Sequence, residues 1–252
     1  MDTRFKAVVL AAGKGTRLHG EDSDAPKVMR ELCGRPMLSY VLDSLSFIAK
    51  EDIIIVVGYG KDEVICRFSG YTFAEQAVQL GTGHAVMAAR EQLSGFSGSA
   101  VVCYGDMPVV RRGTYEELLR EHLRLENDCT ILTGETSLPL AFGRIIRDGL
   151  DRFQRVVEDR DCTPSERMIT ELNTGVYAFR VPPLLGALGQ LGSDNAQGEY
   201  YLTDVPAIML AGGERVGILK RGLGDEILGV NTPEELAQAE EILRRQRQNE
   251  RL

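Results

Sequence analysis

The stretch Ala7-Val-Val-Leu-Ala-Ala-Gly-Lys-Gly-Thr-Arg-Leu18, completed by Ala25-Pro-Lys27, decides the fold of this chain. An unbroken apolar run that ends abruptly in glycine and charged residues is typical of a buried strand followed by a phosphate-binding loop. Gly13 and Gly15 permit positive φ and carry no Cβ, so the backbone can turn N–H groups towards an anion. Neighbouring lysine and arginine side chains add positive charge. We therefore expect this loop to bind a nucleoside triphosphate.

Two better-known phosphate loops do not fit this spacing. The dinucleotide-binding loop needs a third glycine, where this chain has Leu18. The mononucleotide P-loop needs four residues between its glycines, whereas a single residue separates Gly13 from Gly15. For Gly-x-Gly alone, an ordinary tight turn with solvated charges is an equal alternative, so the residues downstream have to decide.

Composition and charge narrow the class of protein. The 252 residues suffice for one sizeable α/β domain or two small ones, and strand-like and helix-like patterns alternate without a linker, which favours one. The formal net charge, 29 minus 37 or −8, argues against a nucleic-acid partner. No apolar run approaches the roughly 18 residues of a membrane span, and charged residues interrupt the N-terminus, so we expect no membrane partner and no signal peptide.

The cysteines and histidines indicate a compartment but no metal site. Five scattered cysteines suit a reducing cytosol, so we expect a cytoplasmic protein. The spacing of the three histidines is not that of zinc ligands.

Periodicity predicts the fold class, a Rossmann-like three-layer α/β/α arrangement with a mixed, mainly parallel sheet. Apolar positions 38, 41, 42, 45 and 48 predict a helix over 37–48, followed by a second buried strand at 53–57. A strand, a helix and a second strand in this order form a right-handed parallel crossover. We therefore expect the first strand to be central and its loop to lie at the carboxyl edge, where open α/β sheets bind ligands. Further strands are predicted at 72–78, 99–104, 129–133, 215–219 and 227–230, and helices at 85–93, 115–125, 183–191 and 199–211.

The alternation of strand-like and helix-like segments changes in the second half of the chain. Strand-like pieces with few helices between them predict a β-rich lobe over about residues 140–180, within a domain that covers 1–232, and a C-terminal helix over 233–252. We expect this lobe to hold a second substrate. Glu158 and Asn173 could hydrogen-bond to a polyol, although either alone is more often a turn former.

Two amides and a glycine indicate a site that reads a base. The side chains of Gln76 and Gln79 each offer a donor and an acceptor, as reading a pyrimidine edge requires. Gly81 lets the backbone approach a base or sugar at the start of a helix. The alternative is an exposed turn in which Thr82 is the N-cap.

Two polar residues are candidate metal ligands at the sheet edge. Asp106 follows a buried strand in Tyr104-Gly-Asp-Met-Pro108, where a carboxylate can ligate a cation; a turn cap is the alternative. Asn231 lies between a predicted strand end and a helix start, at which Thr232 and Glu235 resemble a capping box.

Together these motifs resemble the sugar-nucleotidyltransferase family, whose opening motif Leu-Ala-Ala-Gly-x-Gly-x-Arg-Leu/Met and later Pro-Lys match residues 10–18 and 26–27. Within that family the chain is similar to the N-acetylglucosamine-1-phosphate uridyltransferases, the pyrophosphorylase half of a bifunctional bacterial enzyme. The blocks that carry this narrower resemblance are 79–84, 104–108, 171–175 and 195–204.

The resemblance implies an enzyme that condenses UTP with N-acetylglucosamine 1-phosphate, giving UDP-N-acetylglucosamine and pyrophosphate, with Mg²⁺ as cofactor. It implies that Arg17 and Lys27 face the phosphates and that Asp106 and Asn231 bind the metal. The uridine would be lined by Leu10, Ala11, Ala12 and Gly13, and its uracil would be read by Gln76, Gln79 and Gly81. The acetylamino sugar would be held by Thr82, Tyr104, Gly143, Glu158 and Asn173, with Gly105 as a further substrate-binding position.

Some features depart from the family or leave alternatives open. Ala25 replaces the usual Leu before Pro-Lys, Arg160 replaces a typical Lys, and the acidic segment Glu21–Asp24 has no assigned role. The bifunctional members continue into a β-helix that performs acetyl transfer and trimerises; we expect none in these residues, and the oligomeric state stays open. The same chemistry on another base or sugar, or a catalytically silent UDP-sugar-binding protein, are the alternatives.

Overall fold

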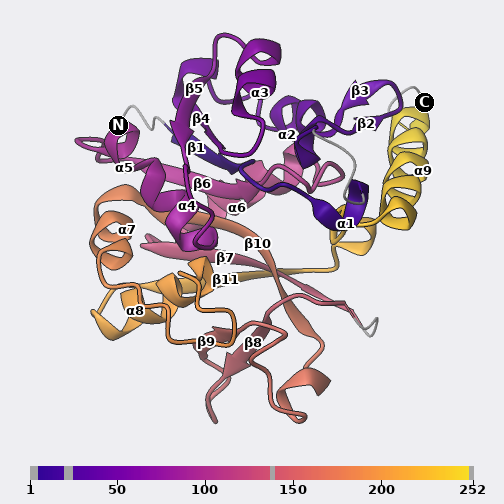
Figure 1. The fold of residues 1–252 in the computed structure, drawn as a ribbon. Helices are drawn as coiled ribbons and strands as arrows, with labels where there is room; N and C mark the ends of the chain where they lie inside the picture. Colours follow the sequence, from indigo (N-terminus) through magenta and orange to yellow (C-terminus); the bar gives the residue numbers. More distant parts are fainter. Residues whose placement is uncertain (1–4, 20–24, 137–139, 250–252) are drawn as a thin grey trace.

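The computed structural model of the chain describes residues 5–19, 25–136 and 140–249 and is built around one mixed sheet (Figure 1). In this sheet β10 runs antiparallel to both of its long neighbours, β6 and β7, whereas the other neighbouring pairs of the main order are parallel. The strand order is β11 (Val216–Arg221), β7 (Cys129–Glu135), β10 (Glu171–Arg180), β6 (Ser99–Tyr104), β1 (Phe5–Leu10), β4 (Ile53–Val57) and β5 (Thr72–Glu75).

Helices cover both faces of the sheet because the strands are apolar on both faces. In β1, Ala7 and Val9 pack into one core and Val8 and Leu10 into the other, as the alternation of side chains along a strand requires. The first core is closed by helices α2 (Met37–Ser44), α3 (Lys61–Arg67) and α6 (Arg112–Arg124). The second is closed by α4 (Thr82–Ala88), α5 (Arg90–Leu93), α7 (Val181–Leu188) and α8 (Val205–Ala211). The predicted three-layer α/β/α fold is therefore confirmed.

Strand β1 lies inside the sheet, as predicted, between β4 and β6. The chain leaves it through α1 (Thr16–His19) and a small hairpin of β2 (Glu31–Leu32) and β3 (Arg35–Pro36). We call the segment from α1 to β3 the N-terminal arm. The C-terminal helix α9 (Pro233–Asn249) packs on this arm through Ala239 and Ile242, which share a core with Leu32. This packing brings the residues before α9 back to the loop after β1 (Figure 1).

The predicted β-rich lobe contains a hairpin of β8 (Arg144–Arg147) and β9 (Phe153–Val157), which extends from β10. In Figure 1 it lies below the main sheet, beside α8. No helix within 5–19, 25–136 or 140–249 is both long and apolar enough to cross a membrane.

Two predicted elements are wrong. The segment 227–230, expected to be a strand, follows a 3-10 turn at Gly224–Glu226 as irregular chain outside the sheet. Leu228 and Val230 pack against α9 instead of a neighbouring strand, and Val230 N donates to the carbonyl of Asp106 at 2.9 Å. Its apolar pattern thus reflects a helix contact.

The helix predicted over 199–211 begins later, with a 3-10 turn at Leu202–Asp204 followed by α8. The residues before it form a turn and bends, and Tyr200 clasps the segment that leads into α4, because its N–H donates to the Leu80 carbonyl at 2.8 Å and its carbonyl accepts from Gly83 N at 2.7 Å. These tertiary hydrogen bonds replace those that a helix would have made.

Candidate active site

Two adjoining cavities lie at the carboxyl ends of β1 and β6. The loop cavity, of about 330 Å³, is lined by the β1 loop with Lys27 and by Gln76, Gln79 and Gly81. The lobe cavity, of about 370 Å³, is lined by Phe142, Gly143, Glu158 and Asn173. The residues that line both are Arg17, Thr82, Tyr104, Asp106, Glu199 and Asn231. The two cavities therefore meet at the predicted catalytic and metal-binding residues.

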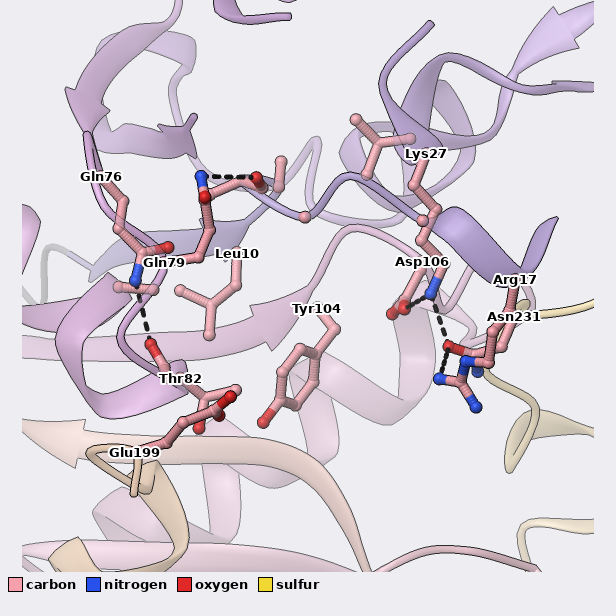
Figure 2. Close-up of a pocket in the computed structure, with 17 residues that line it drawn as sticks. Leu10, Arg17, Lys27, Gln76, Gln79, Thr82, Tyr104, Asp106, Glu199 and Asn231 are labelled. Atoms are coloured by element: carbon pink, nitrogen blue, oxygen red, sulfur yellow. Dashed lines mark hydrogen bonds and ion pairs between the residues drawn. The ribbon is translucent and has the colours of Figure 1, made fainter. Parts of the chain in front are cut away.

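Lys27 lines the loop cavity and contacts two of the residues at this junction. Its side chain comes from a 3-10 turn, Lys27–Met29, and the residue is only 9% exposed. The ammonium forms a short ion pair with Asp106 and donates to the amide oxygen of Asn231 at 2.7 Å (Figure 2). Three residues that are far apart in the sequence thus form one polar cluster.

Gly15 makes the position of Lys27 possible. It adopts φ of 73°, and a Cβ there would lie 2.6 Å from the Cβ of Lys27. Gly13, by contrast, does not adopt positive φ, and a Cβ there would meet no atom within 4 Å. The expectation of positive φ thus holds for the second glycine of the loop.

Arg17 and the start of α9 complete the cluster. Arg17 Nη2 donates to Asn231 Oδ1 at 3.1 Å. The backbone of Asn231 is fixed because its N–H donates to Glu235 Oε2 at 2.6 Å. Glu235 also accepts from Thr232 N at 3.0 Å, and its own N–H donates to the Thr232 hydroxyl at 3.3 Å, so the predicted capping box is present.

The oxygens around Lys27 fit a small, hard cation. A carboxylate oxygen of Asp106 and the amide oxygen of Asn231 already converge on one positive group, the Lys27 ammonium. Oxygen donors are those that Mg²⁺ prefers, and it usually takes its other ligands from water and substrate phosphates. Among the residues that the structure describes, no cluster of three or more His, Cys, Asp or Glu side chains could hold a metal ion, so the pair would need such outside ligands.

Gln76 and Gln79, the residues predicted to read a base, lie at the far end of the loop cavity. Gln76 is 4% exposed, and its Nε2 donates to the Gly81 carbonyl at 3.0 Å. Gln79 is exposed, and its Nε2 lies 3.4 Å from the Ala12 carbonyl. Figure 2 shows both amides on the same side of the cavity as Leu10.

Tyr104 forms the wall between the two cavities. Gly175, with φ of 76°, leaves room for its ring, since a Cβ there would lie 2.2 Å from it. Desolvation raises the pKa of Tyr104, so the phenol keeps its proton. The next residue, Gly105, links the end of β6 to β1, since its N–H donates to the Leu10 carbonyl at 2.9 Å. Gly105 does not itself line either cavity.

The polar residues of the lobe cavity are held by the chain itself. Glu158 Oε1 accepts from the Thr203 hydroxyl at 2.9 Å, and burial raises the pKa of Glu158. Asn173 Oδ1 accepts from Gly175 N at 3.2 Å, and its Nδ2 donates to the Tyr177 hydroxyl at 2.7 Å. Asn173 thus keeps one amide hydrogen for a ligand.

Sequence reasoning assigned no role to several residues that line the lobe cavity, among them Gln197, Glu199 and Tyr201. They belong to the block 195–204, so the motif was found but its side chains were assigned no role. The segment Glu21–Asp24 lies outside the described residues. Arg160 lies in the turn after β9 and is exposed.

The cavity pair, the glycine loop and the sheet define a nucleoside-triphosphate transferase fold, and the chain belongs to the family of MobA-like NTP transferase domains, which matches residues 7–171. It is similar to the bifunctional protein GlmU of Pelotomaculum thermopropionicum, with 42% identity over 95% of this chain and 52% of that protein. The GlmU of Clostridium novyi is 43% identical over 94% of this chain and 52% of that protein. The chain therefore spans about half the length of these relatives.

A solved structure shares the fold at lower identity. A Bacillus anthracis protein assigned as a glucose-1-phosphate thymidylyltransferase superposes with a TM-score of 0.74 and 19% identity, over 94% of each chain. This likeness extends to the fold alone.

Proposed function

We propose that the protein is a uridylyltransferase that condenses UTP with N-acetylglucosamine 1-phosphate, giving UDP-N-acetylglucosamine and pyrophosphate. The observation that carries the proposal is the junction of the loop cavity and the lobe cavity at Asp106 and Asn231, both of which Lys27 contacts. Two substrates in adjoining cavities would meet at this cluster. The similarity to the GlmU relatives over 95% of the chain supports the choice of substrates.

In the proposed reaction an oxygen of the sugar phosphate attacks the α-phosphorus of UTP. The new P–O bond forms as the bond to the bridging oxygen of pyrophosphate breaks, and the leaving group takes that electron pair. The nucleophile is already an anion at neutral pH, so no general base is needed. The barrier lies in bringing two polyanions together, and positioning and electrostatic stabilisation therefore dominate.

Each residue of the cluster has a role in this proposal. Lys27 neutralises charge around the forming bond, and Arg17, exposed at the rim of both cavities, faces the departing pyrophosphate. Tyr104, with a protonated phenol, separates the two substrates. Gln76 and Gln79 read the uracil at the far end of the loop cavity, and Glu158 and Asn173 hold the acetylamino sugar in the lobe.

Mg²⁺ held by Asp106 and Asn231 would neutralise the phosphates and help to align them. Lys27 touches both of these residues, so it would have to share their oxygens with the cation or move towards the phosphates. Two alternatives remain: transfer to another base or sugar phosphate, and a silent UDP-sugar-binding protein. The cluster of Arg17, Lys27, Asp106 and Asn231 favours an enzyme, since a binding protein needs no metal ligands.

A pyrophosphate-release assay over a panel of nucleoside triphosphates and sugar 1-phosphates tests the proposal. We expect release with UTP and N-acetylglucosamine 1-phosphate in Mg²⁺, and loss of release when chelator is added. Release with thymidine triphosphate and glucose 1-phosphate alone would replace the proposed substrates. Binding of UDP-N-acetylglucosamine without release from any pair would favour the silent binder.

A further inference from the structure

Gln76 directly follows β5, and its side-chain amide makes two contacts with the segment that begins α4. Its Nε2 lies 3.0 Å from the carbonyl oxygen of Gly81 and 3.1 Å from Nδ1 of His84, in the first turn of α4. The backbone N–H of Gln76 donates to the Val57 carbonyl at 2.8 Å, so main chain and side chain are both fixed. His84 itself does not line the loop cavity.

The two contacts determine which way the amide points. A backbone carbonyl can only accept, so the group that faces Gly81 is the NH₂ of Gln76 and not its oxygen. His84 Nδ1, which faces the same NH₂, must then accept the second hydrogen, and the neutral imidazole carries its proton on Nε2. Both hydrogens of the amide are therefore engaged, and Oε1 is the group left for the cavity, as Figure 2 shows for Gln76.

Resting on the proposed function, we infer that His84 is a positioning residue that makes the protein select a base with a hydrogen on N3. An amide that presents only its oxygen needs a donor opposite it. Uracil and thymine carry N3–H, whereas N3 of cytosine is an acceptor and would face Oε1 without a hydrogen between them. A free amide could pair with N3 of either uracil or cytosine. The Gly81 carbonyl and His84 Nδ1 occupy its hydrogens, so the Gln76 amide can pair only with a base that donates from N3.

Burial makes this choice matter. Gln76 is 4% exposed, so water is a poor substitute for a lost partner, and a buried acceptor pair is penalised. Sites built to hydrogen-bond a particular group reject analogues that lack it far more strongly than apolar pockets do. Without His84, the NH₂ group is held by the Gly81 carbonyl alone, so the orientation that presents Oε1 loses one of its two hydrogen bonds and is favoured less strongly over the orientation that offers nitrogen to cytosine.

The test compares UTP with CTP in a double-mutant cycle. We expect His84→Phe to lower the UTP-to-CTP ratio of kcat/KM and of binding affinity by about tenfold, with KM for the sugar phosphate unchanged. His84→Asn, whose side-chain oxygen can accept the same hydrogen, should restore most of the ratio. In a Gln76→Ala background, His84→Phe should change the ratio no further, because His84 acts through Gln76. Gln92→Ala, which removes a side-chain amide contact to the Phe73 carbonyl of β5 at 3.2 Å, is the matched control and should leave the ratio unchanged.

The outcomes separate this inference from the proposed function. If the natural protein neither binds nor transfers UTP, the proposed function fails, and the inference fails with it. If it transfers UTP but His84→Phe keeps the natural ratio, only the inference is overturned. An equal loss of UTP and CTP, or a further loss in the Gln76→Ala background, would assign His84 a purely structural role and overturn it too.

Discussion

The ammonium of Lys27 donates to the amide oxygen of Asn231 at 2.7 Å, although the two residues lie 204 positions apart in the chain. The same ammonium pairs with Asp106, so one cation joins the β1 loop, the end of β6 and the start of α9. The distance between these elements is set by the core that α9 shares with the N-terminal arm. The position of the C-terminal helix therefore determines the geometry of the proposed active site.

Replacing Lys27 by Ala should reduce pyrophosphate release by on the order of 10²-fold or more, because one preorganised positive charge at the reacting phosphates is lost. The fold should stay intact, as judged by circular dichroism and thermal unfolding. Lys61→Ala is the control, since Lys61 forms an exposed pair with Glu75 at 2.7 Å away from the cavities. A Lys27→Ala protein that keeps more than a third of the natural rate would contradict the role given to this residue.

Replacing Asp106 by Asn should raise the Mg²⁺ concentration needed for half-maximal activity and lower turnover by on the order of 10²-fold, since the anionic oxygen of the proposed metal pair is removed. The measurement is a magnesium titration of pyrophosphate release. A folded variant with a natural rate and an unchanged magnesium midpoint would exclude the proposed site.

Gly15→Ala should cost about 1–2 kcal/mol in the free energy of unfolding, because a left-handed backbone is unfavourable with a Cβ and that Cβ would collide with Lys27. Gly13→Ala, two residues earlier, should cost less, because Gly13 has ordinary φ and open space around it. Urea unfolding of the two variants gives the comparison. Equal losses of stability in the two variants would contradict the prediction that the left-handed conformation of Gly15 and its close approach to Lys27 require glycine.

Stability should fall in mild acid because of His122, which is 1% exposed between the Ser99 and Thr130 hydroxyls. Burial lowers the pKa of His122 from 6.5 to about 4. The unfolded chain therefore binds a proton that the folded chain rejects, and the stabilisation is complete above pH 6.5 and lost as the pH falls towards 4, by about 3 kcal/mol.

Urea unfolding between pH 4 and pH 7.5 measures this loss. His122→Gln should have a lower free energy of unfolding at neutral pH and a smaller slope against pH below 6.5. An unchanged slope in the variant would assign the acid sensitivity to other groups.

Short sequence patterns predicted correctly the strands of the sheet and the loops that directly follow them. The unbroken apolar run of β1 and the glycines after it placed the loop correctly, and the motif around Asp106 placed that residue at a strand end. The segment 227–230 was predicted wrongly, because an apolar pattern does not distinguish a strand from irregular chain packed against a helix. The clasp made by Tyr200 was missed for a similar reason, since its hydrogen bonds go to residues 117 or more positions away.

The side-chain orientations of the site were beyond sequence reasoning. Gln76 was chosen for carrying both a donor and an acceptor, but which of them faces the cavity depends on Gly81 and His84 and on the turn that brings them near. Lys27 was expected to face phosphates, yet its pairing with Asp106 and Asn231 depends on three separate elements meeting. Such contacts follow from the packing of the whole chain.

Product analysis tests the central claim most directly: the purified protein is mixed with UTP, N-acetylglucosamine 1-phosphate and Mg²⁺, and the products are identified by mass spectrometry. The predicted result is UDP-N-acetylglucosamine and pyrophosphate in equal amounts, formed at the same rate by the natural protein and by Lys61→Ala but more slowly by on the order of 10²-fold or more in Lys27→Ala. The absence of UDP-N-acetylglucosamine with the natural protein, or its undiminished formation by Lys27→Ala, would contradict the account.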